Sequence, residues 1–261
     1  MIFRRDRKRK NGAEEQPEEA IEAENTEADA PAGGAAGPVE EDDLAALDAL
    51  DWRDDGPWDV SEMDDLGGTD QAPKIDLGSL IITGVPGSEL RLQVTEETKE
   101  IVSAMLVIET KVPPPAGQPG KTRTVSSALE LAAYAAPRSG GLWAELRQEI
   151  SEAATAQGGS ASLREGPFGV ELHRFIPVTT PEGEQGYQPS RMWVAEGPRW
   201  LLRGIVYGQA AVEDDVASPV VADVLAAFRQ VVVRRGEEAM APGDLLPLSM
   251  PSTVAAGGEP G

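Results

Sequence analysis

The stretch IDLGSLIITGVPGSELRLQVTEETKEIVSAMLVI, residues 75–108, decides the fold class. It contains three short β-rich or alternating runs, at residues 75–82, 89–94 and 101–108. The turn-forming residues Gly84-Val85-Pro86-Gly87 and the polar run 95–100 separate them. Such alternation between short turns is typical of half-buried strands. The sequence therefore predicts a meander of antiparallel strands.

Further strands and two helices are expected after the Pro/Gly loop at residues 113–120. The expected strands lie at residues 122–136, 168–176, 191–195, 200–207 and, as a last edge strand, 245–250. One helix is predicted from Leu142 to the Gly158-Gly159 stop, because apolar residues recur there at intervals of three and four. A second begins with the cap Ser218-Pro219 and runs to about Val233. This order predicts an α+β fold in which an antiparallel sheet is covered by two helices.

The distribution of apolar residues divides the 261-residue chain into a tail and one domain. Large apolar residues are sparse before Pro73, so we expect a single domain at residues 73–251. The tail, 1–72, is predicted to be disordered, and so are residues 252–261. The tail has three parts: a basic start at residues 1–10, an acidic part at 11–43 and candidate docking segments at 44–63.

Trp52 and Trp58 stand out in this polar tail, because a tryptophan left in water exposes a large apolar surface. Together with Val60 and Met63 they are the candidate docking residues. The surface that they bind is either the protein's own domain or a partner protein, and a tolerated position in a linker is the alternative. Between the two surfaces, intramolecular docking is the preferred interpretation.

The charge is strongly acidic, at −22, and is unevenly placed. Residues 11–72 contain 21 acidic side chains and a single basic one, Arg53. The basic start, residues 4–10, is suited to a weak, salt-sensitive contact with nucleic acid or an anionic surface. Residues 11–20 lack the apolar stretch of a signal peptide, and no window resembles a transmembrane segment. We therefore expect a cytoplasmic protein.

The residue types limit the chemistry. The chain has no cysteine, which excludes disulfides, thiolate nucleophiles and sulfur-ligated metal sites, and its one histidine is His173. We expect no metal, no cofactor and no catalytic residue, because nothing in the spacing of the acids demands a metal site. His173 shares a strand face with Glu171 and Phe175, an arrangement suited to a general base, but no Gly-x-Ser-x-Gly motif accompanies it. A histidine on the polar face of a strand is the ordinary interpretation.

Two features are candidates for binding anions. The turn Arg138-Ser139-Gly140-Gly141 leads into a helix and aims free backbone amides at one spot, with simple helix capping as the alternative. Arg199 and Arg203 lie on one face of a predicted strand and form a candidate cationic surface for the acidic tail, with local pairing to acids as the alternative. Gly120-Lys121-Thr122 is not read as a phosphate loop, because a strand pattern follows it.

Several segments resemble a known family. They are Gly56-Pro57-Trp58-Asp59-Val60, Ala135-Ala136-Pro137-Arg138, Gly197-Pro198-Arg199-Trp200 and Arg234-Arg235-Gly236. This set resembles the actinobacterial domain-of-unknown-function family numbered 3710, over the whole domain. The resemblance implies an actinobacterial cytoplasmic protein and brings no assigned activity or catalytic residues. At fold level only, the element order resembles the Mog1/PsbP-like sandwich.

These observations favour a non-enzymatic binding or regulatory protein that uses its domain and acidic tail to contact a protein partner. Two alternatives stay open. The first is small-molecule (anion) binding or a hydrolytic enzyme using the turn at residues 138–141. The second is an acidic mimic of nucleic acid, which rests on the charge of the tail alone.

Overall fold

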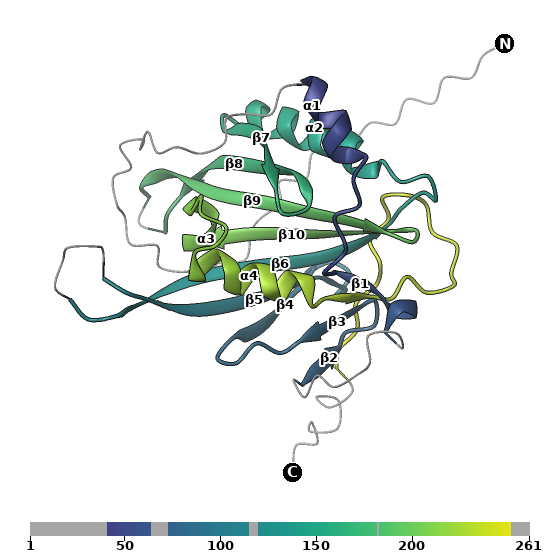
Figure 1. Ribbon diagram of the computed structural model, residues 1–261, viewed down its shortest axis with the longest axis horizontal. Helices are drawn as coiled ribbons and strands as arrows, with labels where there is room; N and C mark the ends of the chain where they lie inside the picture. The colour runs from purple at the N-terminus through teal and green to yellow at the C-terminus, as the bar shows by residue number, and fades with distance from the viewer. Residues whose placement is uncertain (1–40, 64–72, 115–119, 182, 252–261) are drawn as a thin grey trace.

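The computed structural model describes residues 41–63, 73–114, 120–181 and 183–251 (Figure 1). The main element of this part of the chain is a seven-stranded antiparallel sheet. Its strands, from edge to edge, are β4 (Glu89–Val94), β5 (Ile101–Val112), β6 (Arg123–Ala135), β10 (Trp200–Gly208), β9 (Gln185–Gly197), β8 (Gly169–Thr179) and β7 (Ser160–Gly166). Two meanders, β4 to β6 and β7 to β10, therefore meet where β6 pairs with β10. The predicted antiparallel α+β fold is confirmed.

A second sheet of four strands shares the core with the first and joins distant parts of the chain. Its order is β1 (Trp58–Asp59), β11 (Val232–Val233), β3 (Leu80–Thr83) and β2 (Lys74–Asp76). β1 runs parallel to β11, and the other pairs are antiparallel. The single strand predicted at residues 75–82 is wrong, because Gly78 adopts a φ of +86° and turns the chain into the β2–β3 hairpin.

The structure contains the two predicted helices and two further α-helices. α2 (Leu142–Ala156) and α4 (Pro219–Arg229) lie where helices were predicted, and α1 (Glu41–Asp48) and α3 (Gln209–Val212) were not predicted. α4 begins at Ser218, whose hydroxyl accepts a hydrogen bond from the Val221 amide at 3.4 Å. The helix predicted to reach Val233 ends earlier, because Val232 and Val233 form β11.

Two of the predicted strand positions also need correction. β7 lies between the predicted helix and the predicted strand at residues 168–176, in a stretch that was not expected to be a strand. The edge strand expected at residues 245–250 is present only as isolated bridges, from Leu245 to Tyr134 and from Leu248 to Gly78 and Ile101.

Alternate residues of the central strand β10 enter two separate cores. Leu202 belongs to the larger cluster, which contains the α4 residue Phe228, whereas Leu201 belongs to the cluster that contains Trp143 of α2. α4 packs against β5 and β6, and α2 packs against β7 and β8 (Figure 1). Because successive side chains of a strand point to opposite faces, β10 is buried on both of them.

Residues before Pro73 contribute to the fold, which corrects the predicted start of the domain. The buried carboxylate of Asp59 accepts a hydrogen bond from Nε1 of the buried Trp200 at 2.7 Å. The same carboxylate accepts the Ser61 amide at 2.9 Å and so caps the 3₁₀-helix η1 (Val60–Glu62). Gly197 lies under the Trp200 ring, where an added Cβ would approach Cζ2 to 2.1 Å. Trp200 is thus held by a residue that sequence patterns assigned to the tail.

We predict that Asp59→Ala lowers the free energy of unfolding by about 1–3 kcal/mol, because it leaves the buried Trp200 indole without its acceptor. Urea denaturation followed by tryptophan fluorescence measures the effect. Asp54→Ala, which replaces an exposed acid of the same segment, is the control and should leave the midpoint unchanged. Equal stability of the two variants would contradict the assignment.

Candidate functional site

The segment that carries the candidate docking residues contacts the protein's own domain through α1 and Trp52. Asp48 at the end of α1 forms a two-pronged ion pair with Arg147 of α2, with oxygen–nitrogen distances of 2.6 and 2.7 Å. Trp52 packs against the larger core, and its Nε1 donates to the Leu47 carbonyl at 2.8 Å. Gly169 makes room for Trp52, since an added Cβ would approach Nε1 to 2.7 Å. α1 and α2 lie side by side in Figure 1.

Trp58, Val60 and Met63 follow in β1 and η1 and are half-buried. The Trp58 amide donates to the Val231 carbonyl at 2.9 Å, so the backbone of this segment is tied to the second sheet. The structure therefore places Trp52 and the backbone of Trp58 against the domain. Docking of the same residues on a partner stays a prediction.

The turn predicted to bind anions already holds a carboxylate of the protein. Glu196 of β9 accepts the Gly141 amide at 2.8 Å and the Trp143 amide at 2.7 Å. Arg138 and Ser139 beside it are exposed. The helix N-terminus is thus occupied by a carboxylate of the protein itself, and an external anion would have to displace Glu196. Binding of such an anion stays a prediction.

The candidate cationic residues lie in different settings. Arg199 is exposed in the β9–β10 turn with a φ of +64°. Arg203 is half-buried, 3.6 Å from the carboxylate of Glu130 and 5.2 Å from the centre of the Tyr134 ring. Arg203 therefore has a local acidic partner. Residues 11–40, most of the acidic segment, lie outside the described residues, as does the basic start, so their predicted contacts stay predictions.

A buried charged cluster joins β8 and β9 on the α4 side of the sheet. Glu171 accepts hydrogen bonds from Nη2 of Arg191 at 2.9 and 3.1 Å, from Nε1 of Trp193 at 2.7 Å, and contacts Nε2 of His173. Glu171, His173 and Arg191 are 3%, 7% and 3% exposed. The predicted shared face of Glu171 and His173 is thus present, and Arg191 lies directly opposite His173 in the ladder.

The cluster positions the segment after α3. Nη1 of Arg191 donates to the Glu213 carbonyl at 2.8 Å, and Asp214 pairs with Arg164 of β7 at 3.1 Å. Burial raises the pKa of Glu171, but the hydrogen bond from His173 and the charge of Arg191 outweigh it and leave this pKa below its ordinary value. Because protein groups surround the carboxylate, the cluster is suited to holding structure rather than to meeting a substrate.

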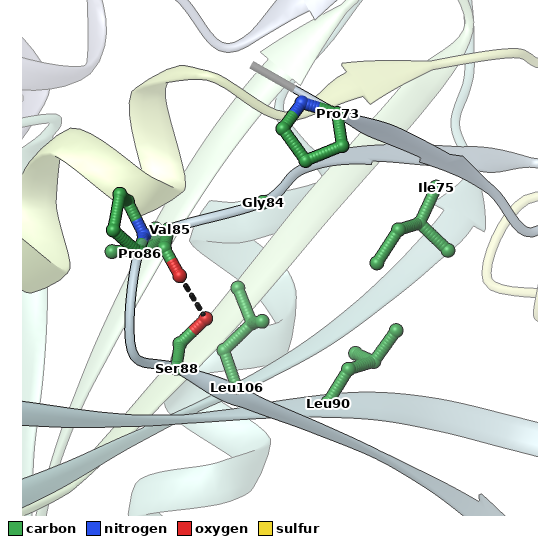
Figure 2. A pocket seen from close by; sticks show the side chains of 8 residues that line it. All are labelled: Pro73, Ile75, Gly84, Val85, Pro86, Ser88, Leu90 and Leu106. Carbon is green, nitrogen blue, oxygen red and sulfur yellow. Dashed lines mark hydrogen bonds between the residues drawn. The ribbon is translucent and has the colours of Figure 1, made fainter.

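An apolar cavity of about 340 Å³ lies between the second sheet and β4 (Figure 2). Its lining consists of Pro73, Ile75, Gly84, Val85, Pro86, Ser88, Leu90 and Leu106. The Ser88 hydroxyl is already used, since it donates to the Val85 carbonyl at 2.8 Å. No titratable side chain lines the cavity, so it offers shape and apolar contact but no acid or base. Among the described residues, no group of three or more His, Asp or Glu side chains is placed to hold a metal ion.

The tip of the β8–β9 hairpin presents aromatic and proline side chains to solvent. Phe175 pairs with Pro189, and Pro177 pairs with Tyr187, so the four residues form a compact block on one face. Phe175 is 45% exposed and Tyr187 is 63% exposed. β7 pairs with β8 only as far as Phe175, and β10 pairs with β9 only from Arg191, so the hairpin extends beyond its neighbours. We call these four residues the hairpin patch.

The family model described as "Protein of unknown function (DUF3710)" matches residues 56–257. The chain belongs to this family. The match confirms the resemblance seen in the sequence, and it begins at Gly56, so it includes β1 and η1. No curated protein and no solved structure matches the chain. In the described residues of this DUF3710 protein, no helix has both the length and the apolar character to span a membrane.

The sequence pattern identified some of these residues and not others. His173, Arg138 and Arg203 were singled out by residue type, whereas Glu196 was missed because it lies 55 residues from Gly141 in the chain. The hairpin patch was missed as well. Its signal is the alternation of Phe175 and Pro177 in β8 with Tyr187 and Pro189 in β9.

We predict that Glu171→Gln destabilises this DUF3710 protein by about 3 kcal/mol near neutral pH, since it leaves Arg191 buried without its charged partner. A folded-state pKa below the unfolded value stabilises the fold above the unfolded pKa, and this contribution is lost as the pH falls through the folded pKa. The wild type should therefore lose more stability than the variant as the pH drops below about 4.5, the ordinary pKa of a glutamate.

Urea denaturation at a series of pH values measures both effects. Glu165→Gln, at an exposed position on the neighbouring β7, is the matched control and should follow the wild type. If Glu171→Gln had the same pH profile as the wild type, the charged cluster would not contribute to stability.

Proposed function

We propose that this protein is a non-enzymatic, cytoplasmic binding or regulatory protein that recognises a protein partner through the hairpin patch. The observation that carries the proposal is the exposure of Phe175 and Tyr187 where the β8–β9 hairpin begins to extend beyond its neighbours β7 and β10. Aromatic side chains in this setting supply much of the binding free energy of protein interfaces when a partner buries them. Where exposed apolar side chains form a contiguous patch, they commonly mark an interaction site.

Residues around α3 enlarge the apolar surface. α3 packs against β9. Arg191 lies two residues from Pro189 on the same face of β9. It donates hydrogen bonds to the carbonyls of Ala210 and Glu213. Val212 in α3 is 53% exposed, and Val216 is 39% exposed. The segment that the buried charged cluster holds in place thus carries two further exposed apolar side chains.

The chemistry of the partner follows from the charges beside the patch. The segment between Val212 and Val216 contains Glu213, Asp214 and Asp215, and the whole chain carries a charge of −22. Asp215 is exposed and, like Glu213, has no arginine or lysine partner among the ion pairs of the described residues. A partner that fits has an apolar centre for the aromatic rings and basic residues at its rim.

The competing functions have less support in the geometry. A hydrolytic or anion-binding role for the turn at residues 138–141 requires Glu196 to leave two backbone amides. His173 is directed at Glu171 inside the sheet, away from the apolar cavity. Mimicry of nucleic acid rests on the tail, most of which lies outside the described residues. For the fold, we also propose a likeness to the Mog1/PsbP-like sandwich, with two helices covering the sheet.

The experiment compares three full-length proteins as baits in the native cytoplasm: the wild type, Phe175→Ser/Tyr187→Ser, and the control Val94→Ser. Val94 is 48% exposed on the edge strand β4, so its variant removes an exposed apolar side chain elsewhere on the sheet. Proteins captured by the wild type and by Val94→Ser but lost from the double variant are then purified. Their dissociation constants are measured by calorimetry at low and high salt.

The double variant should weaken binding of the purified partner by at least about tenfold, or roughly 1.4 kcal/mol, and added salt should weaken the wild-type complex. Val94→Ser should bind as the wild type does. Equal affinity of the double variant and the wild type for every captured protein would overturn the proposal. If only Val94→Ser lost binding, the interface would instead lie at β4.

A further inference from the structure

A row of three side chains crosses the α2 side of the sheet, on the face opposite the hairpin patch. Arg174 of β8 lies directly across from Ser190 of β9. Val206 of β10 pairs with Arg191, so the next residue along β10, Tyr207, lies beside Ser190. The small serine is therefore flanked by two long side chains. Tyr207 packs against the α2-side core, which fixes one wall of the row.

Two polar groups of this row, one on Ser190 and one on Arg174, have no hydrogen-bond partner among the described residues. Ser190 is 3% exposed, and its hydroxyl has no hydrogen-bond partner among the described residues. The buried Nε of Arg174 also has none, and no ion pair joins this arginine to a described acid. Native proteins pair most buried polar groups, because an unpaired one retains the full cost of desolvation. Two such groups at paired positions of neighbouring strands are available to a partner from outside the described residues.

The charges around the row leave it positive. Glu130 is the nearby carboxylate, and it accepts the Tyr207 hydroxyl at 3.3 Å and pairs with Arg203 at 3.6 Å. One acid thus faces two guanidinium groups. Burial lowers the pKa of Arg174 and the charge of Arg203 lowers it further, whereas Tyr207 and Glu130 act in the opposite direction. Both effects reflect a desolvated cation for which the neighbouring acid compensates only in part.

We propose that the row of Arg174, Ser190 and Tyr207 binds an anionic small molecule through a carboxylate or phosphate group. The Arg174 guanidinium provides the charge and its planar donors, and the Ser190 hydroxyl donates a second, neutral hydrogen bond. Tyr207 forms the wall of the site while its hydroxyl stays with Glu130. This site is separate from the turn at residues 138–141 and goes beyond the proposed binding of a protein partner.

Calorimetric titration of the full-length protein at low ionic strength tests the site. The probes are inorganic phosphate and acetate, and the tighter of the two identifies the group that the site prefers. A control titration with potassium chloride at the same ionic strength shows how much of the signal comes from salt screening of the acidic chain rather than from binding of the probe. We expect saturable binding of at least one probe, and Arg174→Gln should weaken it by about tenfold or more. Arg138→Gln is the control, because it removes an exposed arginine from the other candidate anion site.

Ser190→Ala gives a readout that a purely structural role would not produce. It removes a buried hydroxyl that has no partner, so the ligand-free variant should melt at a higher temperature than the wild type. The same variant should bind the probe more weakly, because the second donor is lost. Opposite changes in thermal stability and affinity are the expected signature.

Three results would overturn the proposal. The first is that neither probe binds the wild type saturably, or that potassium chloride gives the same titration signal as the probes. The second is unchanged affinity in Arg174→Gln. The third is loss of binding in Arg138→Gln, which would place the anion at the turn of α2.

Discussion

The antiparallel pairing of β6 with β10 is the contact on which the rest of the structure depends. It joins Ala135 to Trp200 and Ser127 to Gly208, and through it the two meanders become one sheet. The pairing brings together residues that are 65 to 81 positions apart in the chain, so a loss of chain entropy accompanies it. Burial of β10 on both faces offsets this loss, since its alternate residues enter both cores. The same ladder places Glu130 next to Arg203 and Trp200 within reach of Asp59.

Much of the sheet could be predicted because its signals are local. Alternation around Trp200 and the three- and four-residue spacing after Leu142 each depend on neighbouring residues, and these patterns placed β10 and α2 correctly. β1 could not be predicted in this way, because it has only two residues and pairs with β11 far along the chain. The turn at Gly78 was missed although its cause is local. Its positive φ makes a turn inside a run that otherwise has the composition of one strand.

The candidate sites were harder to predict than the fold. Apolar residues at alternate positions show which side chains share a strand face, but not whether a helix or solvent lies over that face. The exposure of Phe175 and Tyr187 is therefore visible only once the neighbouring strands are placed. Glu196 looks like any other strand acid until Gly141 and Trp143 present their amides to it. Arg174 and Phe175 are consecutive residues, and their opposite faces place the two proposed surfaces back to back on the same pair of strands.

The hydrogen bond between Asp59 and Trp200 determines where the chain can be cut. A shortened protein that begins at residue 73 would lose β1, η1 and the only charged acceptor that Trp200 has among the described residues. Its behaviour would report damage to the core as well as the loss of the acidic segment. To separate the two, the boundary has to lie before α1, so that Asp48 and Trp52 stay with the domain that they contact. A protein that begins at residue 41 isolates what the preceding forty residues contribute.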